Sequence, residues 1–323
     1  MRSIAGVLGL IGCVALVMPQ LASAQAYPVK PIRLINGYAA GGANDNLARP
    51  ITQYLSETFG HQVILDHRPG ANGNIGANEV VRATPDGYTL LFATSSQLTI
   101  NPALYKMPFD VLQDLAPIVQ ISMMPLAIFL NAEKPIATAG ELISYMKANP
   151  GKLSFASSGN ASINHLAGEL LAMITRSPLI HVPFKGGGPA LIDTVSGRVD
   201  MIIISVPTPL PFVKSGKLRA LAISSPKRVS VLPDVPTANE VGLPDFQAQA
   251  GTGILAPAKT PRAIIDRINT ETVKYLNSAD GRAKLEAQGV GIVAGTPADF
   301  ANIIRSESTR WAAVVKAGNI KIE

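Results

Sequence analysis

Small and polar residues cluster where the chain is expected to turn from a strand into a helix. The first cluster, residues 39–45, reads AAGGAND. Its glycines allow a ligand to approach the backbone closely, and the first turn of a helix offers unpaired N–H donors at a positive dipole end. Asn44 and Asp45 are candidate helix caps, and Asp45 is spaced to pair with Arg49. A carboxylate-type anion site is predicted here, with a generic glycine-rich loop as the alternative. We assign it to Ala40, Gly41, Gly42 and Asp45.

Three later segments repeat this arrangement, each after an expected strand. They are residues 94–96, 156–162 and 185–188. Ligands of open α/β sheets bind at the carboxyl ends of the strands, so we expect these loops to share one site. The ligand contacts assigned to them are Thr94, Ser95, Ser157, Ser158, Gly159, Ser162, Lys185, Gly186 and Gly187. Asp200, at the start of a buried strand, is a weaker candidate that could cap or bridge loops.

Motifs for catalysis, metals and nucleotides are absent from the sequence. It has no Gly-x-Ser-x-Gly elbow, no His-Glu-x-x-His and no P-loop. Residues 251–256 resemble a dinucleotide fingerprint, but Pro257 and Pro261 interrupt the helix it requires, so we predict a strand between lobes. We expect no cofactor, no metal and no enzymatic activity. A secreted hydrolase remains an alternative, because triad residues need not be neighbours in sequence.

Two further features have structural interpretations. His165 and Glu169 are spaced as neighbours on one helix face, which favours a structural pair over chemistry. Trp311, the only tryptophan, is expected in the core on the last helix.

The elements that must position the loops alternate between strands and helices. Strands are expected at residues 32–35, 63–65, 88–93, 126–130, 153–156, 180–182, 201–204, 218–223 and 253–256. Helices are expected at residues 44–59, 138–149, 162–174, 189–196, 262–276, 279–288 and 297–317. This alternation predicts an α/β fold with parallel or mixed sheets and helices on both faces.

The length of 323 residues suggests two domains. We place the first lobe at residues 25–124 and 251–323 and the second lobe at residues 125–250. The two chain crossings between them would form a hinge.

Residues 1–24 are expected to be a secretory signal peptide. A basic Met-Arg-Ser start precedes an apolar run over residues 4–18 and an Ala-Ser-Ala cleavage site at residues 22–24. We therefore expect a periplasmic protein that begins at Gln25. A lipid on Cys13, which follows Leu-Ile-Gly, is the competing interpretation.

Composition narrows the class of partner. The chain is 47% hydrophobic, which excludes bulk disorder, and 5% aromatic, which argues against a stacking platform for nucleic acid. The net charge of +6 fits a small anionic ligand. With four ligand-type loops, these features favour a two-lobed solute receptor.

Several longer motifs resemble the Bug/TctC family, the extracytoplasmic receptors of tripartite tricarboxylate transporters. In chain order they are YPVKPIR (27–33), AAGGAND (39–45), RPGANGNIG (68–76), PDGYTL (85–90), HLAGE (165–169), VPFKGGGPAL (182–191), GKLRALA (216–222) and LPDVPT (232–237). The resemblance covers essentially the whole chain after the signal peptide.

The resemblance implies a Venus-flytrap fold of the type II periplasmic-binding-protein kind. It implies a di- or tricarboxylate, an acidic amino acid or an aromatic carboxylate as ligand, held by residues 38–45, which adds Tyr38 to the site. The loops at residues 157–162 and 185–187 would close from the second lobe. The implied partner is a membrane permease; a receptor that signals to a sensor kinase is the alternative.

Two positions depart from the family pattern. Asn36-Gly37 stands where Val-Pro is common, and His67 where Asn is common. We expect the first change to loosen the first loop and to alter ligand choice.

Overall fold

A computed structural model describes residues 27–41, 43–287 and 290–321. The expected signal peptide, Cys13 and Gly42 lie outside these residues. Among the described residues, no helix combines the length and apolar character needed to cross a membrane.

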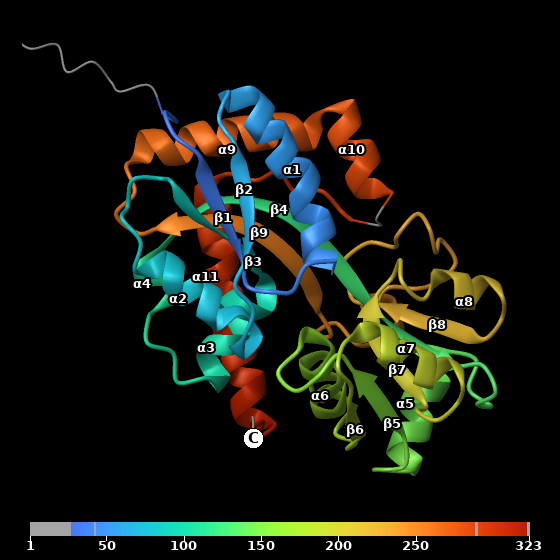
Figure 1. The fold of residues 1–323 in the computed structure, drawn as a ribbon. Coiled ribbons are helices and arrows are strands. Elements are labelled where there is room, and N and C mark those ends of the chain that lie inside the picture. Colours follow the sequence, from blue (N-terminus) through green and yellow to red (C-terminus); the bar gives the residue numbers. More distant parts are fainter. Residues whose placement is uncertain (1–26, 42, 288–289, 322–323) are drawn as a thin grey trace, which may run out of the picture.

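The first half of the molecule contains five strands in the order β2-β1-β3-β9-β4 (Figure 1). Their bounds are β1 Ile32–Asn36, β2 Val63–His67, β3 Thr89–Thr94, β4 Leu115–Asn131 and β9 Gln249–Pro257. Strands β1, β2 and β3 are parallel, whereas β9 is antiparallel to β3 and β4. The loops after β1, β2 and β3 therefore meet at one edge.

The second half is built on the end of β4. Strands β7 (Met201–Ser205) and β8 (Leu218–Ile223) flank it, and β5 (Ser154–Ser157) and β6 (Ile180–Pro183) extend the sheet beyond β7. Strands β5, β6 and β7 are parallel. Their carboxyl ends form a second edge of loops.

Helices cover both faces of each half. In the first half, one face carries α1 (Ala43–Phe59), α9 (Arg262–Asn277) and α10 (Ala279–Glu286). The other carries η1 (Ala71–Gly73), α2 (Asn74–Val81), η2 (Ser96–Ile100), α3 (Asn101–Leu104), α4 (Val111–Asp114) and α11 (Pro297–Ala317). In the second half, α5 (Ala139–Ala148) and α6 (Ile163–Thr175) lie opposite α7 (Gly187–Val195) and α8 (Leu210–Lys214). A short turn, η3, spans Asn239–Val241. The predicted mixed α/β fold is confirmed.

Strand β4 is longer than the sequence indicates. It pairs with β9 up to Pro125 and with β7 and β8 from Leu126 onward, so one strand belongs to both halves. The sequence pattern predicts a strand only in its second part, at residues 126–130. Prolines usually interrupt a strand ladder. Here Pro117 lies at a register shift and Pro125 at the point where β4 changes partners.

The last helix contacts both halves. Near its start, Phe300 and Ile304 pack into the core of the first half. Near its end, Trp311 and Val314 pack with residues of α6 in the second half. Trp311 is 1% exposed, which confirms its predicted core position. At 21 residues the helix is about 31 Å long, enough to reach from one half to the other beside the crossings of β4 and β9.

Candidate ligand-binding site

The first loop is anchored by the buried carboxylate of Asp45. Its Oδ2 accepts hydrogen bonds from the Gly41 N–H (2.8 Å) and from Arg49 Nε (2.9 Å). Its Oδ1 lies 2.8 Å from His67 Nε2. Burial alone would raise the pKa of Asp45, but the hydrogen bonds from Gly41, Arg49 and His67 outweigh it and hold the pKa below its usual range. Because its oxygens are occupied, Asp45 shapes the loop around Gly41, while Ala40 at the tip is exposed.

Tyr38 joins the ends of strands β1 and β3. Its hydroxyl lies 2.9 Å from Thr94 Oγ1 and donates to the Asn72 carbonyl at 3.3 Å. Burial raises the pKa of Tyr38 to about 12, so the phenol is neutral and remains a hydrogen-bond donor. Two predicted site residues, Tyr38 and Thr94, are therefore in direct contact.

The segment Asn36-Gly37 is tightly packed, so the expectation of a loosened loop is wrong. A Cβ on Gly37 would lie 2.6 Å from Gly73 Cα, which shows that two backbone segments touch there. The Asn36 side chain is fully buried, and its Oδ1 accepts from the Tyr38 N–H at 3.2 Å. Asn36 Nδ2 has no hydrogen-bond partner among the residues that the structure describes.

The loop between β5 and α6 uses its serine hydroxyls to hold its own shape. Ser157 Oγ lies 2.6 Å from His181 Nε2, and Ser158 Oγ donates to Asn164 Oδ1 at 2.7 Å. Ser162 Oγ donates to the Gly159 carbonyl at 2.7 Å and accepts from the His165 N–H at 3.2 Å, which caps α6. The predicted residues Ser157, Ser158, Gly159 and Ser162 therefore lie together in this loop.

The loop between β6 and α7 lies beside the preceding one. The Phe184 N–H donates to the Ser157 carbonyl at 3.0 Å, and a Cβ on Gly159 would lie 3.3 Å from the Phe184 carbonyl oxygen. Gly159 and Gly186 have φ values of 127° and 113°, which favour glycine. Lys185 is exposed, and Gly187 begins α7.

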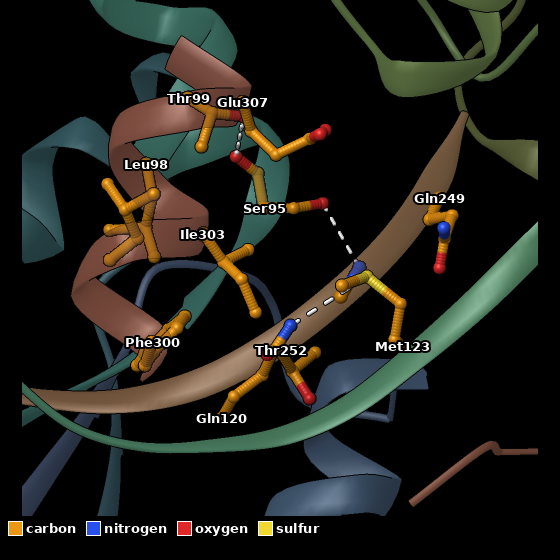
Figure 2. A pocket seen from close by; sticks show the side chains of 12 residues that line it. Ser95, Leu98, Thr99, Gln120, Met123, Gln249, Thr252, Phe300, Ile303 and Glu307 are labelled. Carbon is orange, nitrogen blue, oxygen red and sulfur yellow. Dashed lines mark hydrogen bonds between the residues drawn. The ribbon is translucent and has the colours of Figure 1, made fainter. Parts of the chain in front are cut away.

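Ser95 lies beside β4 and β9, the two strands that run between the halves, and not beside the first loop. Its Oγ accepts from the Gly251 N–H of β9 at 3.0 Å (Figure 2). The cavity in Figure 2 lies between η2, α11 and the paired strands β4 and β9. Its volume is about 20 Å³. That is room for about one water molecule. The cavity is therefore too small for an organic acid, and Ser95 supports strand β9.

Asp200 is not brought together with the other candidates. It precedes β7, whereas the loops at Ser157 and Lys185 follow β5 and β6, at the opposite ends of parallel strands. Its carboxylate contacts Lys134 Nζ (2.5 Å) and accepts from the Ser154 N–H (2.7 Å). Asp200 therefore bridges Lys134 and Ser154, which agrees with its place as the weaker candidate in the sequence.

The structure adds residues that sequence reasoning missed. His67 supports the first loop and His181 the loop at Ser157. A third second-half loop, residues 206–209, follows β7 at the same edge; it has no glycine and only one small polar residue, Thr208, so it gave too weak a signal. Val206 and Pro207 border a cavity of about 630 Å³ that also touches Met124, Pro125 and the segment after α10, so it lies between the halves. Because β7 runs parallel to β5 and β6, its direction alone would have placed this loop at the same edge as the loops that follow those strands.

Among the described residues, no three His, Cys, Asp or Glu side chains are arranged to hold a metal ion. The predicted pair of His165 and Glu169 is confirmed, with Nε2 3.7 Å from Oε1.

Comparisons with known proteins agree with this fold. The tripartite tricarboxylate transporter family receptor model, TctC, matches residues 47–320. Protein BugT of Bordetella pertussis is 35% identical over 306 residues, which is 93% of each chain. A solved periplasmic transporter is 36% identical and covers 92% of this chain and all of its own, with a TM-score of 0.79.

Two solved relatives hold carboxylates. Rpa4515 of R. palustris, solved with adipate, is 32% identical, with a TM-score of 0.80 over 91% of this chain and 99% of its own. MatC of Rhodopseudomonas palustris, with bound malate, is 31% identical, with a TM-score of 0.77 over 90% of this chain and 100% of its own. The chain therefore belongs to the TctC/Bug family of tripartite tricarboxylate transporter receptors, which are periplasmic solute-binding proteins rather than enzymes.

Proposed function

We propose that this protein captures a small organic carboxylate between its two halves and delivers it to a tripartite tricarboxylate transporter permease. Adipate and malate, the ligands of two relatives of similar fold, are both dicarboxylates. Di- and tricarboxylates are therefore the first ligands to test.

The observation that carries the proposal is the loop between β1 and α1. Asp45 accepts the Gly41 N–H and so fixes the loop just before α1, where the remaining backbone N–H groups of the first turn and the helix dipole favour a negative charge. Asn36 Nδ2 adds a buried donor with no partner among the described residues. An unmade hydrogen bond of this kind costs about 1–3 kcal/mol, so a ligand or water oxygen there would be stabilising.

The second half supplies the opposite side of the site. The loops at residues 157–162 and 185–187 lie side by side, and Lys185 brings a positive charge to them. A carboxylate that bonds both halves favours the closed form, because only that form makes both sets of contacts. β4 and β9, which run between the halves, are the natural hinge.

Export and delivery rest on the sequence and the family. Residues 1–24 have the pattern of a signal peptide, and the matching family model describes a transporter receptor. We infer a periplasmic location and a membrane permease as partner.

A thermal-shift screen tests the binding proposal. The panel is adipate, malate, citrate, glutamate and benzoate, with adipamide as the neutral control. A ligand at 100 times its Kd adds about 2.7 kcal/mol to the free energy of unfolding, which raises Tm clearly. Stabilisation by at least one acid but not by adipamide is expected. No shift with any acid at millimolar concentration would contradict the proposal.

A further inference from the structure

Two stacked imidazole rings lie beneath the loop between β5 and α6. His165 on α6 and His181 on β6 have ring centroids 3.8 Å apart and planes within 8° of parallel. Phe155 on β5 lies beside both rings, with its centroid 4.9 Å from that of His181 and 6.4 Å from that of His165. His165 is 6% exposed, so its ring is packed inside the second half and does not lie free on the surface.

Each ring contacts a different end of the loop. Ser157 Oγ, where β5 ends, lies 2.6 Å from His181 Nε2. The Ala161 N–H, just before α6, donates to His165 Nδ1 at 3.2 Å. Ala161 has a φ of 61°, a left-handed conformation that is unfavourable for alanine and persists only where the surroundings hold it. The pair therefore fixes both ends of a loop that bears Ser158 and Gly159.

The contact at Ala161 depends on protonation. A ring nitrogen accepts a hydrogen bond only when it carries no proton, so a doubly protonated His165 cannot accept from Ala161. Two rings this close cannot both be cationic without strong repulsion. Burial and the neighbouring His165 lower the pKa of His181 to about 4, and Glu169 opposes that shift.

The charged groups around the pair come from two elements. Glu169 lies on α6, with Oε1 3.7 Å from His165 Nε2. Lys321, after α11, lines the same cavity of about 380 Å³ as His165, Glu169, His181 and Asn160. The cavity gives solvent protons access to both rings, and Glu169 attracts one of them.

We propose that His165 and His181 are positioning residues that hold the loop at residues 157–162 in its ligand-binding shape only while both rings are neutral. At acidic pH the pair takes up a single proton, which frees the Ala161 end of the loop and weakens solute binding. This inference rests on the proposed function, because it assigns the loop to the solute site.

The binding test uses adipate and malate as probes. In the double variant H165N/H181Q, Asn can place an amide oxygen where Nδ1 stood, Gln can reach Ser157, and neither residue titrates. The acids titrate themselves, so the measured quantity is the ratio of the variant's affinity to that of the native protein at each pH. H61N, on the first half, is the matched control.

We expect the ratio of variant to native affinity, whatever its value at pH 7, to rise about threefold or more between pH 7 and pH 5; one proton allows at most about tenfold per pH unit. A ratio that is the same at both pH values would overturn the proposal. H165L, which removes the acceptor, should bind roughly threefold to tenfold more weakly at pH 7, the equivalent of one hydrogen bond.

A second measurement needs neither a ligand nor a variant. Amide hydrogen exchange at Ala161 in the native protein should lose protection between pH 7 and pH 5, after correction for intrinsic exchange, while amides in β1 keep theirs. Constant protection at Ala161 would overturn the proposal even if adipate binds. Lost protection without binding of any acid would support the imidazole pair and contradict the proposed function instead.

Discussion

Replacing Asp45 with alanine should destabilise the protein strongly, because the carboxylate makes three hydrogen bonds from a side chain only 2% exposed. At about 1 kcal/mol net for each bond, the loss is about 3 kcal/mol. Breaking a fully buried ion pair costs about 3–5 kcal/mol. The partner Arg49 is 61% exposed and can return to water, so we expect the lower end, about 3 kcal/mol.

The chain contains a matched control for this prediction. Asp266 pairs with Arg262 four residues away at 2.8 Å, nearly the distance of the Asp45–Arg49 pair, but Asp266 is 50% exposed. An exposed pair contributes little, so D266A should change stability hardly at all. Urea denaturation at pH 7 gives both free energies of unfolding. Equal losses in D45A and D266A would refute the reasoning that burial makes Asp45 the anchor of the first loop.

Four further outcomes are expected. G37A should weaken binding of the best acid at least tenfold by calorimetry, because its Cβ meets the Gly73 backbone at 2.6 Å and neither segment can yield without moving the first loop; unchanged affinity would contradict this. The free energy of unfolding should fall as pH drops from 6.5 toward 4, because the unfolded chain then takes up a proton that folded His181, with its pKa lowered to about 4, does not. The slope from one group is at most about 1.4 kcal/mol per pH unit, and H181Q should show a smaller slope between pH 6.5 and 5 in urea titrations, above the range in which carboxylates take up protons. W311A should lower the free energy of unfolding by about 3–5 kcal/mol, since Trp311 is buried in a core shared with α6; a loss below 1 kcal/mol would show that α11 does not link the halves. Intact-mass analysis of exported protein should show a chain starting at Gln25, and a lipidated species starting at Cys13 would contradict the expected cleavage.

Local patterns were sufficient to predict where loops follow four of the strands; that these loops bind the ligand stays a prediction. Glycines and small polar residues after apolar runs mark the ends of β1, β3, β5 and β6, and these signals are short-range. The same rule failed at β7, whose following loop has no glycine and only one small polar residue, Thr208, among valine and prolines. Asp200 is a candidate because it begins a strand and could bridge loops, but that start lies at the opposite end from the loops that follow the parallel strands β5 and β6.

Supporting contacts were not predictable in the same way. His67 reaches Asp45 from 22 residues away, and His181 reaches Ser157 from 24 residues away. Such contacts depend on which strands pair, and pairing is set by tertiary packing rather than by neighbours in sequence. The full extent of β4 was hidden for a similar reason, because a bulge and a change of partners accommodate its prolines.

Isothermal titration calorimetry with a dicarboxylate and its diamide tests the central claim most directly. With native protein at pH 7, adipate or malate should bind with one-to-one stoichiometry. The matching diamide should bind at least tenfold more weakly, because charge-assisted hydrogen bonds are about twice as strong as neutral ones. Equal affinity for acid and diamide, or no binding of either acid by a folded protein, would contradict a carboxylate receptor.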